Sequence, residues 1–318
     1  MIALLKSHIS GNDEQFLSIA LQIAAHEARI GHVKLAEELR DLIDKAREKA
    51  QLPIEKRAPI YVMQPKGELA SLVSVAYPTT KLNALSLPEE ISNRLQRVLK
   101  EQRHQRMIRD HGLAPRRKLL LVGPPGSGKT MTASALAGEL NLPLLTILLE
   151  AVITRFMGET AVKLKLIFDA MENTRGVYLF DEFDAIGSKR TSTNDVGEIR
   201  RVLNSFLQFL EKDVSQAVII AATNHPELLD KALFRRFDDV IEYHLPDEAL
   251  AREMLSRRLA AFDCEQLEWS IVLENTHGLS QADIARAGDD AAKEAVLKSS
   301  RTIDTQVLVG ALKERRSL

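Results

Sequence analysis

One stretch of the sequence, residues 117–130, constrains the fold more than any other. It reads Arg117-Lys-Leu-Leu-Leu-Val-Gly-Pro-Pro-Gly-Ser-Gly-Lys-Thr130, and residues 131–140 then have the pattern of a helix. The apolar run from Leu119 to Val122 predicts a buried parallel strand. A strand, a glycine-rich loop and a helix in this order form the context of a phosphate-binding P-loop, rather than of a tight turn that happens to carry glycine and lysine. The chain is therefore predicted to be an α/β protein built around this loop.

The loop has the chemistry to capture a nucleoside triphosphate. Its glycines let backbone N–H groups point at phosphate oxygens, and the following helix adds the positive end of its dipole. Lys129 can reach the β- and γ-phosphates, while the hydroxyl of Thr130 can bind Mg²⁺. The predicted nucleotide contacts are Gly123, Pro124, Pro125, Gly126, Ser127, Gly128, Lys129, Thr130 and Met131.

The rest of the core is predicted from apolar runs that alternate with helical patterns. Strands are expected over residues 142–149, 176–184, 217–224 and 240–245, with helices over 160–171 and 198–210. Such alternation specifies a parallel sheet that is covered by helices on both faces. Beyond residue 246 the strand signal stops, and helices are expected over 249–262, 281–297 and 305–313. We therefore expect an α/β core over residues 81–245 and an all-helical lid over 246–318.

The region before the core has a different character. Residues 12–50 carry two runs of apolar residues at helical spacing, which predicts a helical hairpin within residues 1–50. Four prolines then mark residues 51–80 as a linker, with a short strand near Leu72–Val75. The hairpin alone is too small for a substantial core, so we expect it either to pack on another element or to dock a partner.

Composition and charge exclude several classes of protein. The 318 residues carry a formal net charge of −1, so nothing global favours a nucleic acid or an acidic membrane surface as partner. The single cysteine, Cys264, allows no internal disulfide and fits a reducing compartment. No apolar run is long enough to cross a bilayer, and the first residues lack the pattern of a signal peptide. We expect a cytoplasmic protein with no membrane partner.

A helix that begins after Leu87 is unusually rich in cations. It carries Arg94, Arg97, Lys100, Arg103 and Arg106, and Arg109 follows. A basic helix can contact nucleic acid, but here no aromatic residues are interleaved, and Glu101 and Asp110 dilute the charge. A solvated face or a contact between subunits is the favoured interpretation.

Polar residues at the ends of two predicted strands supply the chemistry of hydrolysis. Asp181 and Glu182 follow four apolar residues, at the edge of the sheet where the P-loop lies. Asp181 can hold Mg²⁺ through water, and Glu182 can polarise an attacking water. Asn224, at the end of the next strand, can orient the same water or touch the γ-phosphate. The alternatives are acids that cap a strand and an asparagine that forms a turn before Pro226.

Two adjacent arginines, Arg235 and Arg236, follow near the same edge. An arginine here can stabilise transition-state charge in a neighbouring subunit's site, as an arginine finger. The alternative is a surface ion pair with Asp238 or Asp239.

In their order along the chain, these motifs resemble the AAA family of ATPases. Gly-Pro-Pro-Gly-Ser-Gly-Lys-Thr, Phe-Asp-Glu-Phe-Asp, Ala-Ala-Thr-Asn and Arg-Arg-Phe-Asp match that family across residues 82–300. The resemblance implies an ATP- and Mg²⁺-dependent ring, usually hexameric, with an α/β core and a helical lid. It also implies that Asn224 is the sensor residue and Arg236 the finger. In the family this segment reads Arg-Pro-Gly-Arg-Phe-Asp. This chain lacks the Pro-Gly, and Arg235 is the candidate for the place of the first arginine.

Further stretches resemble segments of the same family. Arg155-Phe-Met-Gly-Glu159 is similar to the first pore loop, in which Phe156 and Met157 would grip an extended polypeptide. Gly278-Leu-Ser-Gln-Ala-Asp-Ile284 is similar to a lid segment near the nucleotide. In that segment Gln281 replaces the usual glycine, so Ala282 is the one residue that we assign to the nucleotide site by resemblance. Where the family often has Asp-Ile-Gly-Gly beside the adenine, this chain has Asn83-Ala-Leu-Ser86.

The residues and the resemblance together predict a Mg²⁺-dependent ATPase that forms a homo-oligomeric ring and remodels or threads protein substrates. One alternative is a nucleotide-gated scaffold or regulator of a separate, co-encoded effector such as a protease. A short helical N-terminus before one AAA module resembles bacterial ATPases of that kind, including some in defence against phage. The other alternative is a DNA-remodelling ATPase, which only the basic helix favours.

Overall fold

The computed structural model describes residues 65, 67–153, 157–184, 195–229 and 231–316. The hairpin predicted within residues 1–50, the first part of the linker, and Phe156 lie outside them. All described elements belong to one compact unit, Met63–Leu318.

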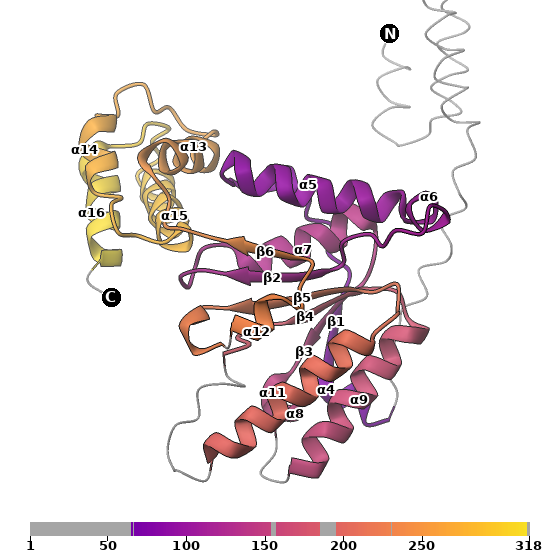
Figure 1. Ribbon diagram of the computed structural model, residues 1–318. Coiled ribbons are helices and arrows are strands. Elements are labelled where there is room, and N and C mark those ends of the chain that lie inside the picture. Colours follow the sequence, from indigo (N-terminus) through magenta and orange to yellow (C-terminus); the bar gives the residue numbers. More distant parts are fainter. Residues whose placement is uncertain (1–64, 66, 154–156, 185–194, 230, 317–318) are drawn as a thin grey trace, which may run out of the picture. The chain divides into compact units, whose positions relative to one another are not determined.

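Six strands form one sheet in this unit (Figure 1). In spatial order they are β1 (Val73–Ala76), β3 (Leu144–Ile147), β4 (Val177–Phe180), β5 (Val218–Thr223), β2 (Lys118–Val122) and β6 (Asp239–Glu242). The last five run parallel, which confirms the predicted parallel sheet, whereas β1 pairs antiparallel with β3. The sequence places a strand near residues 72–75 but not its direction, because no strand–helix–strand unit leads into it.

Helices cover both faces of the sheet, as Figure 1 shows. They are α5 (Glu89–Arg103) and α7 (Lys129–Leu140) on one face, and α9 (Met157–Asn173) and α11 (Asp195–Lys212) on the other. Successive side chains of a strand point to opposite faces. Leu119 and Leu121 of β2 therefore pack under α5 and α7, while Leu120 and Val122 join the core under α9 and α11. These four side chains are buried, which is why the strand reads as a continuous apolar run.

The C-terminal part is helical, as predicted. It consists of α13 (Glu248–Arg258), α14 (Trp269–Glu274), α15 (Gln281–Leu297) and α16 (Thr305–Arg316), which share a separate hydrophobic core. A capping box sets the start of α15: the Ser280 hydroxyl accepts the Asp283 N–H, and the Asp283 carboxylate accepts the Ser280 N–H. The sequence analysis missed α14, because six residues are too few to show a helical period. None of the described helices is both long and apolar enough to cross a membrane.

Short elements join the main ones. They are α4 (Leu69–Leu72), η1 (Leu82–Ala84), α6 (Gln105–Asp110), α8 (Leu149–Val152), η2 (Pro226–Leu228) and α12 (Lys231–Phe234). The four strands predicted after the P-loop are all shorter than expected, and this includes β5 and β6. β3 stops at Ile147 and Leu149 already belongs to α8, while β4 stops at Phe180 and leaves the acidic residues beyond the strand.

Several cations of the basic helix α5 are engaged inside the unit. The guanidinium of Arg94 pairs with Asp239 and donates to the Val240 carbonyl 2.6 Å away. Arg103 pairs with Glu139 of α7 at 2.8 Å. These pairs fasten α5 to the sheet and to α7, and they leave Arg97 and Lys100 as exposed cations of the helix.

Candidate active site

A cavity of about 570 Å³ lies at the carboxyl-terminal edge of the parallel strands. One side is made by loop residues 125–131, by Asp181 and Glu182 after β4, and by Asn224 after β5. The other side is made by Ala84, Leu85, Ser86, Met254, Arg257, Arg258, Gln281, Ala282 and Ala285. The structure thus brings residues 125–131 of the predicted loop, the predicted acids, Asn224 and Ala282 together around one space, whereas Gly123 and Pro124 are not part of the described lining.

The P-loop, residues 123–130, has a backbone that only glycine adopts easily. Gly126 and Gly128 have φ of +73° and +94°, in the left-handed region. Gly126 is also tightly packed, because a Cβ built there would lie 2.5 Å from the Ser280 hydroxyl oxygen of the lid. A Cβ on Gly123 would lie 2.4 Å from the carbonyl oxygen of Tyr243. The glycines therefore let the loop curl and let β6 and the lid approach it.

Lys129 is buried at the base of this loop, with 6% of its surface exposed. Its Nζ donates to the carbonyl oxygens of Gly123 and Pro124, both at 2.8 Å. Burial lowers the pKa of the ammonium, and the carboxylates of Asp181 and Asp184 act in the opposite direction. The loop carbonyls hold the cation where triphosphate oxygens can replace them as acceptors.

Thr130 and Asp181 meet as the metal-site prediction requires. The Thr130 hydroxyl donates to the Asp181 carboxylate at 2.7 Å. Mg²⁺ keeps several waters and uses one or two protein oxygens together with substrate phosphates. This pair therefore fits a Mg²⁺ ion that arrives with a nucleotide. The described residues contain no cluster of three histidine, cysteine or acidic side chains that would hold a metal by themselves.

Glu182 occupies a strained backbone position beside the cavity. Its φ is +50°, a conformation that costs a residue other than glycine about 1–3 kcal/mol. The next residue, Phe183, is fully buried and donates its N–H to the Ala222 carbonyl at 2.8 Å. The turn between them sends Phe183 into the core and leaves the Glu182 carboxylate exposed at the cavity, where a water can reach it.

Asn224 presents an unused acceptor at the same edge. Its Oδ1 is buried and finds no hydrogen-bond partner within the described part of the chain. Asp184 holds its backbone, since one carboxylate oxygen accepts the Thr223 hydroxyl at 2.9 Å and the Asn224 N–H at 3.2 Å. No role was predicted for Asp184 from the sequence. Its position at the end of the Phe-Asp-Glu-Phe-Asp motif could have identified it as a site residue.

The two predicted arginines lie away from this cavity. Arg235 and Arg236 follow α12 with exposed side chains, and neither is among the described residues that line the cavity. Arg236 forms an ion pair with Glu211 near the end of α11. The alternative pairing with Asp238 is not observed, because the Asp238 carboxylate accepts the backbone N–H groups of Arg117 and Lys118 at 2.8 and 2.9 Å.

The lid contacts the P-loop directly. The Ala282 N–H donates to the Gly126 carbonyl at 3.0 Å, next to the Ser280 contact. The Oε1 of Gln281 lies 3.3 Å from the position of a Cβ built on Gly128. Three residues of the lid helix α13 also line the cavity and were not predicted: Met254, Arg257 and Arg258. The helical pattern of α13 does not indicate which of its faces meets the core.

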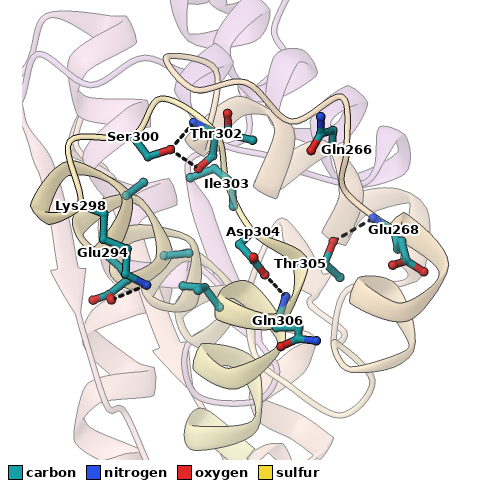
Figure 2. A pocket seen from close by; sticks show the side chains of 13 residues that line it. Gln266, Glu268, Glu294, Lys298, Ser300, Thr302, Ile303, Asp304, Thr305 and Gln306 are labelled. Atoms are coloured by element: carbon teal, nitrogen blue, oxygen red, sulfur yellow. Dashed lines mark hydrogen bonds and ion pairs between the residues drawn. The ribbon is translucent and has the colours of Figure 1, made fainter.

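A second cavity, of about 440 Å³, lies within the lid (Figure 2). Its labelled polar groups largely pair with one another. Lys298 bonds Glu294, the Ser300 hydroxyl bonds Thr302, Asp304 accepts the Gln306 N–H, and the Thr305 hydroxyl accepts the Glu268 N–H. Paired groups of this kind stabilise the turns around α16 and indicate a structural role.

The two predicted pore-loop residues are placed only in part. Met157 begins α9, and Phe156 lies outside the described residues. Their role as a polypeptide grip stays a prediction.

The chain is similar to proteins of one family in sequence and in fold. Residues 119–245 match a family described as "ATPase family associated with various cellular activities (AAA)". "Uncharacterized AAA family ATPase y4kL" of Sinorhizobium fredii is 33% identical over 308 residues, which are 96% of this chain and 91% of that protein. The crystal structure of the FIGL-1 AAA domain has a TM-score of 0.61 at 20% identity, covering 81% of this chain and 92% of that one.

Other relatives are longer than this chain. The proteasome-activating nucleotidase of Pyrococcus abyssi is 34% identical over 212 residues, 64% of this chain and 53% of that protein. The ATP-dependent zinc metalloprotease FtsH of Lancefieldella parvula is 35% identical over 227 residues, 69% of this chain and 35% of that protein. The similarity thus spans about half or less of these two relatives.

We expect Lys129→Ala to abolish detectable binding of ATP, because the loop would lose the one cation buried at its base. Isothermal titration with Mg²⁺ and ATP measures the effect. Lys293→Ala is the matched control, since Lys293 is an exposed lid residue paired with Asp290 at 3.0 Å and should leave binding unchanged. Normal ATP affinity of the Lys129 variant would contradict the assignment of the loop.

Proposed function

This chain belongs to the AAA family of ATPases and hydrolyses ATP with Mg²⁺, and on that premise we propose that it forms a ring that remodels or threads protein substrates. In such a ring each ATP lies between two subunits. One subunit contributes the P-loop cavity and its neighbour contributes Arg236.

The position of Arg236 is the observation that carries the proposal of shared sites. The residues of the hydrolytic site surround one cavity, whereas Arg236 is exposed, paired with Glu211 and outside the described lining of that cavity. An arginine that completes a site in trans must lie on the surface of its own subunit. The ion pair with Glu211 keeps the guanidinium oriented until a neighbour's nucleotide offers a stronger acceptor.

Within one subunit the proposed division of labour follows from the geometry. Lys129 and the loop N–H groups bind the phosphates, and Thr130 and Asp181 hold the Mg²⁺ that accompanies them. Glu182 accepts a proton from the attacking water, while the side-chain amide of Asn224 orients that water. Asp184 acts through Asn224, because its carboxylate accepts the Asn224 backbone N–H and the side-chain hydroxyl of the preceding Thr223.

A protein substrate is supported by the relatives and by the sequence around Phe156. Relatives at 34–35% identity are named as a proteasome-activating nucleotidase and an ATP-dependent metalloprotease, and both names concern proteins that act on other proteins. Phe156 and Met157 precede or begin α9, which packs on the sheet beside α11. A motion of this helix would carry the pore loop with it.

The alternatives differ in their support. A DNA-remodelling role has less support, because Arg94 and Arg103 of α5 are paired within the unit and only part of the basic helix, including Arg97 and Lys100, presents exposed cations. Regulation of a separate effector, including one in bacterial defence, remains the second candidate. It is favoured by the predicted short helical N-terminus before one AAA module, which resembles bacterial ATPases that work beside a separate protease.

Glu182→Gln should bind ATP with normal affinity and hydrolyse it at least about 100-fold more slowly, because the amide cannot accept the proton of the attacking water. Phosphate release and ATP titration measure the two effects separately. Glu274→Gln, at an exposed lid glutamate, serves as the control. Turnover near the wild-type rate would show that Glu182 is not the general base.

Arg236→Ala alone should lower ATP hydrolysis by about 10³-fold, as expected for loss of a finger. Mixing it with inactive Lys129→Ala subunits should restore part of the activity, because an intact cavity then meets an intact Arg236. Arg235→Ala is the matched variant and tests whether the adjacent arginine takes part. If no mixture of the two inactive variants regains activity, Arg236 does not act in trans.

Phe156→Ala should retain ATP hydrolysis but lose the stimulation of hydrolysis by an unfolded protein such as reduced casein. Phe156→Tyr should keep the stimulation, because it preserves the aromatic ring. Unchanged stimulation in the alanine variant would count against threading and favour the regulatory role.

A further inference from the structure

Residues 82–87 form a thin wall between two cavities. On one side Ala84, Leu85 and Ser86 line the nucleotide cavity. On the other side the same segment lines a second cavity of about 890 Å³, which α5 and Glu139 of α7 also border. Leu85 and Arg257 belong to both linings. Leu82 and Leu87, at the two ends of the segment, pack against the core under α5 and α7, and hydrogen bonds add to this packing in holding the residues between them.

Those hydrogen bonds come from two different parts of the fold. At the start of the wall, Lys81 donates to the Gly138 carbonyl, and the Leu82 N–H donates to Glu139 at 3.3 Å. Both of these acceptors belong to α7. Further along, Arg257 of the lid helix α13 donates through Nη1 to the carbonyls of Asn83 at 3.2 Å and Leu85 at 3.4 Å. The wall is therefore attached to the core at one end and to the lid along its length.

The wall borders the end of the cavity that is opposite to the triphosphate. The phosphates must lie against loop residues 125–130, so the base and the ribose extend toward the remaining lining. That part is largely apolar, with Leu85, Met131, Met254 and Ala285. An apolar slot of this kind suits a nucleobase, which gains from burial of its faces.

We propose that Arg257 is a positioning residue that holds the base end of the nucleotide cavity in its binding shape. Affinity for the nucleoside part of ATP then depends on the lid, whereas affinity for the triphosphate part depends on the P-loop. The proposal rests on ATP binding in this cavity and does not require a ring or a protein substrate.

The surroundings of Arg257 favour this role. Its Nη2 pairs with Glu253, one turn earlier on α13, at 3.0 Å, which leaves Nη1 directed at the wall. One guanidinium can make both contacts because its donors form a rigid fork. Arg258, the next residue, also lines the nucleotide cavity, but it pairs with Asp289 of α15 instead of with the wall.

The test compares ATP with inorganic tripolyphosphate, each titrated with Mg²⁺ into the full chain carrying Glu182→Gln to prevent turnover. Adding Arg257→Ala should weaken ATP binding by about three- to tenfold, the effect of losing two partly exposed hydrogen bonds. Tripolyphosphate binding should stay within about twofold, because Arg257 is not part of the loop that binds it. Arg257→Lys should recover part of the ATP affinity.

Arg252→Ala is the matched control on the same helix. The Arg252 guanidinium lies 5.0 Å from the centre of the Trp269 ring, within the lid, and should be neutral toward both ligands. Three results would each overturn the proposal: unchanged ATP affinity after Arg257→Ala, equal weakening of both ligands, or the same loss of ATP affinity in the control. A defect in ring assembly or in protein remodelling would leave the comparison of ligands unaffected.

Discussion

The parallel pairing of β2, β4 and β5 is the interaction on which the site depends. Val122 pairs with Thr223, and Phe180 pairs with Ala221, so the three strands end at nearly the same level. The residues that follow them, including Gly123, Asp181 and Asn224, therefore meet at one edge. A slip of one residue would exchange the side chains that face α5 and α7 with those that face α9 and α11, so packing on both faces maintains the geometry of the site.

The P-loop is closely packed between two segments that are distant from it in the sequence. The end of β6 lies against Gly123, and the start of α15 lies against Gly126. Tyr243, beyond β6, is itself fixed by a hydrogen bond of 2.8 Å between its hydroxyl and that of Thr132, and burial raises its pKa to about 12. The shape of the loop is thus linked both to the sheet and to the position of the lid.

The two ends of the nucleotide cavity are built in different ways. The phosphate end comes from one continuous stretch, residues 125–130, completed by Asp181 and Glu182 after β4 and by Asn224 after β5. The base end is assembled from η1 and from the lid helices α13 and α15. A movement of the lid would therefore alter the base end of the cavity, and it would also reach the P-loop through the contacts of Ser280 and Ala282 with Gly126.

The sequence by itself determined the parallel α/β core, the helical lid, the P-loop and the polar residues at the strand ends. Each of these follows from local periodicity or from a motif within about 14 consecutive residues. The helix α15 begins at Gln281, as predicted, and the structure shows that Ser280 and Asp283 cap it locally.

Only the tertiary structure decided the direction of β1 and the bonds of Asp184 to Thr223 and Asn224. The same holds for the pairing of Arg236 with Glu211, and for the contact of Arg257 with Asn83, which is 174 residues away in the sequence. These features join side chains and backbone groups from distant segments. Periodicity shows which face of an element is buried, but it does not show which distant residue that face meets.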